Sequence, residues 1–281
     1  MTQFSEGRAS ARLTSGAQEL RERACGSTSL RIGCVKYLNA KPLIFGWRGD
    51  VVFDHPAALC QQLATGQLDV AFVSSFEVLR NPIYTIVDGV AVASVGPVHS
   101  VFLAHIEPLE EIEEIAVDAA SQTSVHLLRC LLAERNLRPR LVSTDAAAQT
   151  GARGAQLIIG DQAIAFRQNN TGKYRFWDLA TAWREAAELP FVFAVWLIRP
   201  KVADAAGIAE KLRCLRDENL RALDKVIAAQ RHFAPEFCAF YFRECLQFDF
   251  ADAEKAGLLR FRSLCEKHGI LPVNPAPLRL A

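Results

Sequence analysis

The chain has 281 residues, and its 32 Lys and Arg residues balance 31 Asp and Glu residues, which leaves a formal net charge of +1 at pH 7. This length exceeds what one hydrophobic core usually serves, so we expect two domains. The near-neutral charge predicts no basic face for nucleic acid or an anionic membrane. No apolar run reaches the roughly 18 residues of a membrane span, so no membrane partner is expected either.

The first 29 residues contain no apolar segment of the kind found in a secretory signal. We therefore expect residues 1–29 to form a flexible extension and the protein to be cytoplasmic.

The eight cysteines form no CxxC pair and show no metal-type spacing with histidine, so the sequence predicts no metal site. Cys130 and Cys238 lie inside apolar periodic runs, which is typical of buried free thiols in a reducing cytoplasm. A nucleophilic cysteine is the alternative, and Cys34 is the one nearest to the site predicted below.

From residue 30 onward, short apolar strands alternate with helical segments, which predicts an α/β fold. Pro42 marks the start of a short helix, since proline is tolerated at a first helical position. Gly66 ends the next helix, as glycine commonly does. Strands are expected over 30–37, 51–55, 68–75, 84–94 and 100–105, and helices from Pro42, over 56–66 and over 76–81.

The pattern restarts near residue 103, and the rest of the chain after the long strand reads as helical, with apolar residues three and four apart. Because this segment contains no further α/β unit, its helices are expected to pack on the part of the fold that precedes them. The second block is predicted to hold strands over 113–119, 139–144 and 155–161, a helix over 121–136, a Trp-rich loop, a long strand over 189–198 and helices over 202–270.

Two such blocks predict a two-lobed, hinged protein with an interlobe cleft. Lobe 1 would comprise 30–102 and 195–281, lobe 2 would comprise 103–194, and the crossings would lie near 101–104 and 190–195. Periodicity alone also fits a simple tandem of two α/β domains, and it indicates no oligomeric state.

Several polar residues follow predicted strand ends, where α/β proteins usually bind their ligands. Asn39 follows the first strand, and Ser74 lies at the carboxyl end of the third. Gly96 and Pro97 form a turn ahead of Ser100, which could reach the cleft from a hinge strand or bond the adjacent backbone.

Ser121, Thr123 and Ser124 begin a helix, where free N–H groups and the helix dipole favour an anion. A plain N-cap is the alternative for these hydroxyls. Gly160 and Asp161 end a strand of the second block, where Asp161 could cap a helix or contact ligand.

Six strings occur in one order: "YLNAKP" (37–42), "VSSFEVLRN" (73–81), "VASVGPVHSV" (92–101), "SQTSVHLLR" (121–129), "LIIGDQAI" (157–164) and "LPFVFAVW" (189–196). Together they closely resemble the chorismate dehydratase family of the futalosine route to menaquinone, over about residues 30 to 270. The resemblance implies a fold like that of type II periplasmic binding proteins, with the C-terminal helices packed on lobe 1. It also implies loss of water from chorismate to give 3-[(1-carboxyvinyl)oxy]benzoate, with no metal and no organic cofactor.

In that family the asparagine of "YLN" and the serine of "GPVxS" are regarded as key active-site residues, which correspond here to Asn39 and Ser100. The substrate-binding residues expected around them are Tyr37, Ser74, Gly96, Pro97, Ser121, Thr123, Ser124, Gly160 and Asp161.

The quoted strings contain no Asp–His pair, no paired glutamates and no Ser–His–Asp set. His99 adjoins Ser100, but adjacent strand residues point to opposite faces, and His126 lies inside a helix. The hypothesis is therefore that a substrate carboxylate takes the proton while Asn39 and Ser100 orient the reacting groups.

Three alternatives remain. They are a non-catalytic binding or sensor protein for a small carboxylate, a different lyase or isomerase acting on a related cyclic acid, and a LysR-type effector domain. Nothing in the sequence resembles the DNA-binding helix-turn-helix that the last would carry.

Overall fold

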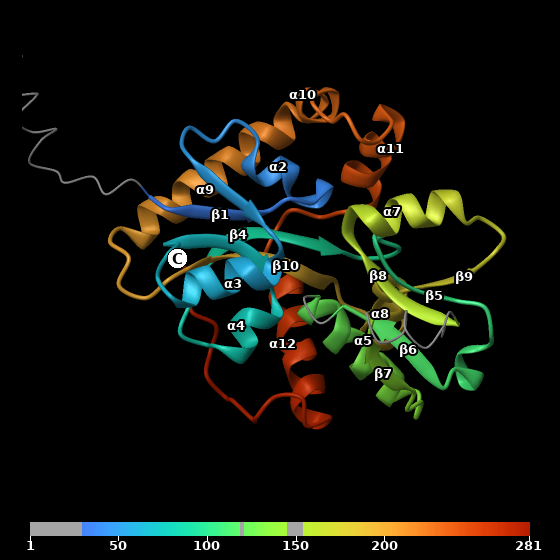
Figure 1. The fold of residues 1–281 in the computed structure, drawn as a ribbon. Coiled ribbons are helices and arrows are strands. Elements are labelled where there is room, and N and C mark those ends of the chain that lie inside the picture. The colour runs from blue at the N-terminus through green and yellow to red at the C-terminus, as the bar shows by residue number, and fades with distance from the viewer. Residues whose placement is uncertain (1–29, 119–120, 145–153) are drawn as a thin grey trace, which may run out of the picture. The chain divides into compact units, whose positions relative to one another are not determined.

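A computed structural model describes residues 30–118, 121–144 and 154–281, so the expected extension over 1–29 lies outside the described residues. Arg31–Ala281 form one compact unit built on two five-stranded sheets and flanking helices (Figure 1). This confirms the predicted α/β class. In the described part of the chain, no helix is long and apolar enough to cross a membrane.

The first sheet is nearly all apolar at its centre, which explains why its strands read as continuous hydrophobic runs. β1 and β10 are buried along their whole length. β1 pairs in parallel with β2 and β3, whereas β10 runs antiparallel to β3 and β4. The strand order is β2 (Val51–Asp54), β1 (Ile32–Val35), β3 (Val70–Ser74), β10 (Phe191–Ile198), β4 (Thr85–Ser94).

The second sheet repeats this topology with different residues. β6 pairs in parallel with β7 and β8, and β5 runs antiparallel to β8 and β9. Each sheet thus holds four strands of one direction and one antiparallel strand, the first that the chain forms after crossing from the other sheet. The strand order is β7 (Arg140–Ser143), β6 (Glu114–Val117), β8 (Ala155–Ile159), β5 (Val101–His105), β9 (Arg175–Asp178).

Short helices follow the strands of both sheets, and proline starts several of them. Pro56 begins α3, Pro235 begins α11 (Pro235–Phe240), and Pro42 is the second residue of α2. Proline lacks only an N–H that the first helical turn leaves unused. These helices are α2 (Lys41–Ile44), α3 (Pro56–Ala64), α4 (Phe76–Arg80), α5 (Gln122–Glu134), α7 (Gly160–Asn169) and α8 (Leu179–Ala187), with 3₁₀ turns η1 (Leu38–Ala40) and η2 (Leu109–Glu111).

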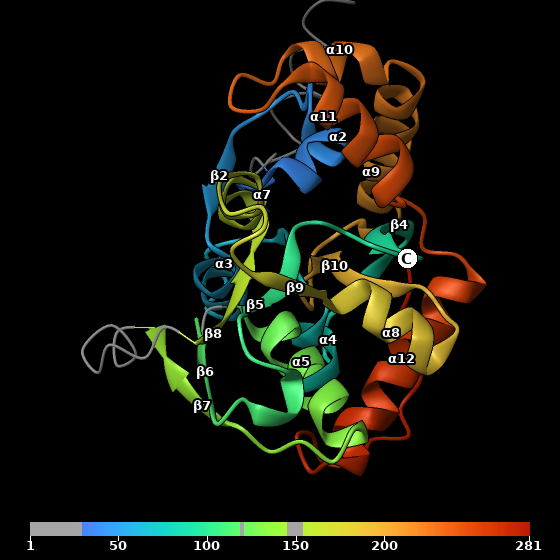
Figure 2. The ribbon, with the colours of Figure 1, turned by 90° about the vertical axis from the view of Figure 1, so that its right-hand side faces the viewer.

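The C-terminal helices pack on the first sheet, as expected. α9 contacts β4 and α2, and α12 contacts β10 and also reaches α5 beside the second sheet (Figure 2). They are α9 (Ala205–Arg221), α10 (Leu223–Ala228), α11 (Pro235–Phe240), the π-helical turn η3 (Tyr241–Cys245) and α12 (Asp252–Lys267).

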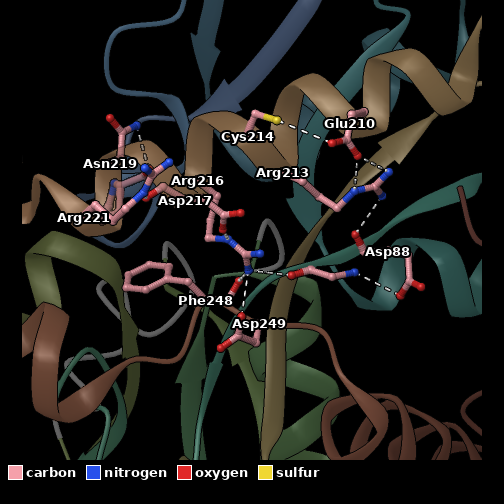
Figure 3. Close-up of polar contacts among 12 residues, drawn as sticks. Asp88, Glu210, Arg213, Cys214, Arg216, Asp217, Asn219, Arg221, Phe248 and Asp249 are labelled. Carbon is pink, nitrogen blue, oxygen red and sulfur yellow. Dashed lines mark hydrogen bonds and ion pairs between the residues drawn. The ribbon is translucent and has the colours of Figure 1, made fainter.

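Arginine side chains on α9 bind β4 of the first sheet and the residues Phe248 and Asp249, which precede α12 (Figure 3). Arg216 Nη1 donates to the carbonyl oxygens of Gly89 at 2.7 Å and Phe248 at 3.0 Å, and pairs with Asp249 at 2.8 Å. Arg213 Nη1 donates to the carbonyls of Asp88 and Ala281. The carbonyl groups of Asp88 and Gly89 in β4, and those of Phe248 and Ala281 beside it, therefore accept hydrogen bonds from charged donors.

The prediction of a Trp-rich loop before the long strand is wrong, because this segment forms β9 and α8. Asp178 is the N-cap of α8 and accepts hydrogen bonds from Ala180 N at 3.1 Å and Thr181 N at 3.2 Å. Trp183 is fully buried on the inner face of α8, and its Nε1 donates to the Pro190 carbonyl at 3.2 Å. Its indole packs the helix against the first sheet rather than marking a loop.

The chain passes between the sheets twice. It leaves the first sheet after Ser94 in β4 and enters the second at Val101 in β5, and it returns between Ala187 in α8 and Phe191 in β10. Both connections are short, so the two sheets are tied closely at these points.

Candidate active site

A cavity lies where the carboxyl ends of strands from both sheets meet, the place where α/β proteins usually bind their ligands. It is reached by the ends of β1, β3 and β8 and by the start of α5. One wall is polar, formed by Tyr37, Asn39, Ser74, Ser100, Ser121, Gln122, Thr123, Ser124 and Gly160. The rest is apolar, formed by Val35, Pro56, Val98, Val101, Ile159, Phe193 and Ala194.

Eight of the eleven residues expected from the sequence therefore line one cavity. Gly96, Pro97 and Asp161 do not line it. Gly96 and Pro97 belong to the crossing ahead of Ser100, where Pro97 is exposed. Asp161 lies in the first turn of α7, because β8 ends at Ile159 and the helix begins at Gly160.

Asn39 is presented by η1, directly after β1. Its Oδ1 is buried and has no hydrogen-bond partner among the residues that the structure describes. An unsatisfied buried acceptor costs about 1–3 kcal/mol, so a ligand that donates a hydrogen bond here would recover that energy. Asn39 thus follows the carboxyl end of a strand, where α/β proteins usually bind their ligands.

The N-terminus of α5 faces the cavity with a row of small polar side chains. Ser121 is the N-cap but makes no side-chain cap hydrogen bond, so the plain capping role is not the one it performs. The first N–H groups of a helix have no partners within it and carry partial positive charge. This end of α5 is thus suited to a carboxylate without any lysine or arginine.

Thr123 joins the two halves of the site. Its Oγ1 is in contact with Ser74 Oγ, and it accepts a hydrogen bond from Phe76 N at 3.1 Å at the start of α4. Thr123 therefore holds α4 of the first half against α5 of the second. Its hydroxyl group therefore holds the two halves of the site together, and the residue also lines the cavity.

Ser100 is held from three sides at the crossing before β5. Asp178 accepts hydrogen bonds from Val98 N at 3.0 Å and His99 N at 2.9 Å, which fixes His99 in a left-handed conformation with φ of 61°. The Ser100 carbonyl accepts from Gly160 N at 2.7 Å. Its hydroxyl accepts from Tyr241 Oη at 2.6 Å.

His99 does not line the cavity, although the reason differs from the expected one. The residue lies in a bend rather than a strand, and its ring packs edge-on against Phe240 with 5.2 Å between ring centroids. Burial, followed by the charge of Arg167, lowers the pKa of His99.

Tyr37 and Gly160 meet across the cavity from the two sheets. Gly160 has a φ of 66°, and a Cβ placed there would lie 2.9 Å from Cδ1 of Tyr37. Beside them, Asp161 Oδ1 accepts a hydrogen bond from Leu38 N at 2.8 Å. Asp161 thus joins α7 to η1, a role that neither the cap nor the ligand expectation described.

The cavity is poor in groups that could act as a protein base. Among the described residues that line it there is no Asp, Glu, His, Cys, Lys or Arg. Burial, followed by the charges of Asp118 and Asp161, raises the pKa of Tyr37, so its phenol stays protonated. The lining offers neutral hydrogen-bond donors and acceptors, not an acid–base pair.

The nearby ionisable groups are also unsuited to catalysis. Cys34 is fully buried in β1, and burial raises the pKa of its thiol to about 12, which disfavours the nucleophilic alternative. His126 stacks on Phe76 with 4.0 Å between ring centroids. In the part of the chain that the structure describes, no group of three or more His, Cys, Asp or Glu residues is placed to hold a metal.

Sequence reasoning missed Gln122, the apolar wall and the two residues that hold Ser100. Gln122 lies inside a quoted string, so its place at the helix start could have indicated it. Phe193 and Ala194 read only as a buried strand. Asp178 and Tyr241 carry no local signal, since their partners lie about 80 and 141 residues away.

The fold places the protein among those with a periplasmic-binding-protein architecture. The aliphatic sulphonate-binding protein SsuA of Escherichia coli superposes with a TM-score of 0.61 at 17% identity, covering 87% of this chain and 88% of that one. A Candida albicans protein described as having the generic periplasmic binding protein fold gives 0.53 at 11% identity, covering 88% and 92%.

The sequence comparisons are more specific. Residues 30–267 match the model of a family described as menaquinone biosynthesis. A chorismate dehydratase of Thermus thermophilus is 31% identical over 220 residues, covering 71% of this chain and 80% of the relative. The chain therefore belongs to this menaquinone biosynthesis family, which confirms the resemblance drawn from the quoted strings.

Proposed function

We propose that this protein is a chorismate dehydratase, a hydro-lyase that converts chorismate to 3-[(1-carboxyvinyl)oxy]benzoate in the futalosine route to menaquinone. The observation that carries the proposal is the cavity lining, which combines an apolar wall, neutral hydroxyl and amide groups and a helix N-terminus. Family membership and the dehydratase relative from Thermus thermophilus point to the same reaction.

Chorismate carries two carboxylates on a cyclohexadiene frame, and each part has a counterpart in the cavity. The ring carboxylate would bind at the N-terminus of α5, beside Ser121 and Ser124. The ring would lie against Phe193 and Val101. Asn39 and Ser100 would then contact the enolpyruvyl carboxylate and the C4 hydroxyl.

The reaction removes a proton from C3 and hydroxide from C4. In the proposed mechanism the enolpyruvyl carboxylate takes the C3 proton, the electron pair of that C–H bond forms the new C3–C4 double bond, and the C4–O bond breaks with its electrons on oxygen. The hydroxide and the proton leave together as water. The absence of an acid–base residue from the described lining supports this use of the substrate's own carboxylate.

The role of the protein is then to orient groups and to stabilise developing charge. Ser100 would donate to the departing oxygen, and Asn39 would hold the carboxylate over C3. The ring becomes aromatic, which supplies the driving force. We include independence of metal and organic cofactors in the proposal, because every step uses only the substrate and neutral side chains.

The proposal also covers the division of the chain and its compartment. The two sheets would be the cores of the two lobes expected from the sequence, and the crossings before β5 and β10 would act as hinges. We assign the protein to the cytoplasm because chorismate is a cytoplasmic metabolite.

The test is to incubate purified, EDTA-treated protein with chorismate and follow the aromatic enol ether by absorbance and mass spectrometry. One equivalent of water lost per chorismate is expected, without added metal. Tight chorismate binding without product would favour a binding or sensor protein. Product formation only after metal is restored would refute the cofactor independence but not the reaction.

A further inference from the structure

Tyr241 lies outside the cavity, yet it contacts one of the two residues expected to be catalytic. Its Oη donates a hydrogen bond to Ser100 Oγ at 2.6 Å, across 141 residues of sequence. Tyr241 is 1% exposed and its ring stacks on Phe237, with centroids 5.6 Å apart and planes inclined by 15°. It is the first residue of the π-helical turn η3, a feature frequent at functional sites.

This contact decides where the Ser100 hydrogen can point. A serine hydroxyl has one donor and two acceptor positions, and Tyr241 occupies an acceptor position. Among the described residues, Ser100 Oγ has Tyr241 as its only side-chain partner. Because Ser100 also lines the cavity, its own O–H remains available to a ligand there.

We propose that Tyr241 is a positioning residue that turns the Ser100 O–H toward the substrate and strengthens it as a donor. A hydroxyl that accepts a hydrogen bond becomes a better donor, since linked hydrogen bonds polarise one another. The inference rests on the proposed dehydration, in which Ser100 assists departure of the C4 oxygen.

The phenol is suited to this role because it stays neutral. Complete burial raises the pKa of Tyr241 well above its usual range, and the hydrogen bond to Ser100 offsets this only in part. Tyr241 therefore remains a donor at any working pH. The rings of Phe237 and Phe242 pack near the Tyr241 ring, with centroids 5.6 Å and 6.0 Å away.

The test uses Tyr241→Phe, which removes one oxygen and keeps the ring packing. We expect kcat to fall about 10- to 100-fold while KM for chorismate changes less than threefold. Tyr84→Phe is the control, because it also removes a hydroxyl from a buried tyrosine, one that does not line the cavity. It should keep the wild-type kcat.

A double-mutant cycle separates positioning from loss of stability. If Tyr241 acts through Ser100, the variant carrying both Tyr241→Phe and Ser100→Ala should be no slower than Ser100→Ala alone. A Tyr241→Phe enzyme within twofold of wild-type kcat, or a double variant whose loss equals the product of the single losses, would overturn the inference.

The same cycle run on chorismate affinity by calorimetry distinguishes this inference from the proposed function. If the wild-type protein binds chorismate without forming product, the proposed dehydration is wrong. The role of Tyr241 is then decided by whether Tyr241→Phe and Ser100→Ala have non-additive effects on chorismate affinity. Additive effects on affinity then overturn it. A wild-type protein that neither binds nor converts chorismate overturns both.

Discussion

Leu38 and Asp161 connect the two halves of the site: the Leu38 N–H donates to Asp161 Oδ1 at 2.8 Å, from η1 of one half to α7 of the other. Asn39 follows Leu38 directly in η1. This hydrogen bond therefore holds the backbone that carries the Asn39 amide, which is expected to be catalytic. Asp161 is thus a structural link beside the cavity, although it does not line it.

Asp161→Asn and Asp161→Ala should differ because only asparagine keeps the acceptor. Asp161→Ala leaves the buried Leu38 N–H without a partner, which should lower the free energy of unfolding by about 1–3 kcal/mol and lower kcat/KM. Asp161→Asn should keep near-wild-type activity. Urea unfolding and initial rates check both, and equal losses in the two variants would contradict the link.

The pH dependence adds a second readout. Burial raises the pKa of Asp161 above its usual value, with the hydrogen bond from Leu38 opposing this in part. The folded state therefore holds the proton more tightly than the unfolded state, and the wild-type protein loses stability as pH rises through that pKa. Asp161→Asn should remove this loss, so its stability relative to wild type should be higher at pH 7 than at pH 4.

Asn39→Ala and Ser100→Ala should each lower kcat by about 10²–10³-fold, because in the proposed mechanism each supplies a preorganised group at the reacting atoms. His99→Ala should lose much less, since the ring packs on Phe240 away from the cavity. Steady-state rates of product formation measure all three. An inactive His99→Ala enzyme that still binds chorismate would show that the base belongs to the protein.

Gly160→Ala should impair substrate binding through Tyr37. The new Cβ would lie 2.9 Å from the Tyr37 ring, so the ring must move within the cavity wall. We expect KM for chorismate to rise about tenfold or more. The matched control is Gly172→Ala, at a φ of 80° with no atom within 4 Å of the new Cβ.

Both alanines carry the backbone cost of a left-handed conformation, about 1–2 kcal/mol. Only the Gly160 variant should change KM. If the two variants show the same KM, then the contact with Tyr37 plays no part in binding.

The sequence predicts the strand ends of this site well because they depend on local signals. The apolar runs before Asn39 and Ser74 and the polar start of α5 are each readable within about ten residues. The quoted strings then bring together eight residues that share one cavity. What these residues contact across the cavity is not a local property.

Apart from Gln122, the misses share one physical cause, which is long-range packing. Asp178 caps α8 and also accepts hydrogen bonds from the backbone N–H groups of Val98 and His99. The residues next to Asp178 in the sequence give no indication of these second contacts. The repeated strand order of the two sheets is likewise invisible, since different residues build each. Trp177 and Trp183 resemble loop residues until the partners that bury Trp183 are known.

Arg216→Ala should destabilise the protein without changing the site. The buried guanidinium serves the carbonyls of Gly89 and Phe248, and both would lose a charged donor. We expect a loss of about 2–4 kcal/mol in the free energy of unfolding.

Arg243→Ala is the control, since its ion pair with Asp224 is mostly exposed and such pairs contribute about 0–1 kcal/mol. Chemical unfolding followed by tryptophan fluorescence measures both variants. Equal losses would mean that the network around α9 adds no more than a surface ion pair.

His126 should make stability depend on pH between about 4 and 6.5. Burial, followed by the charges of Arg129 and Arg80, lowers its pKa to about 4 from a usual value of 6.5. Above pH 6.5 the imidazole is neutral in both states. As pH falls below 6.5 the unfolded chain binds a proton that the folded state does not, so stability is lost until the folded state is protonated near pH 4.

His126→Phe should remove this dependence and keep the stacking on Phe76, whose ring centroid lies 4.0 Å from the imidazole. Carboxylates with lowered pKa, such as Asp69 at about 2, lose their contribution mainly below pH 4.5 and do so in both proteins. The difference between the two unfolding free energies, measured in urea from pH 7 to pH 5, therefore isolates the histidine. The wild-type protein should lose stability relative to the variant over that range, and parallel curves would show that His126 protonates equally easily in the folded and unfolded chain.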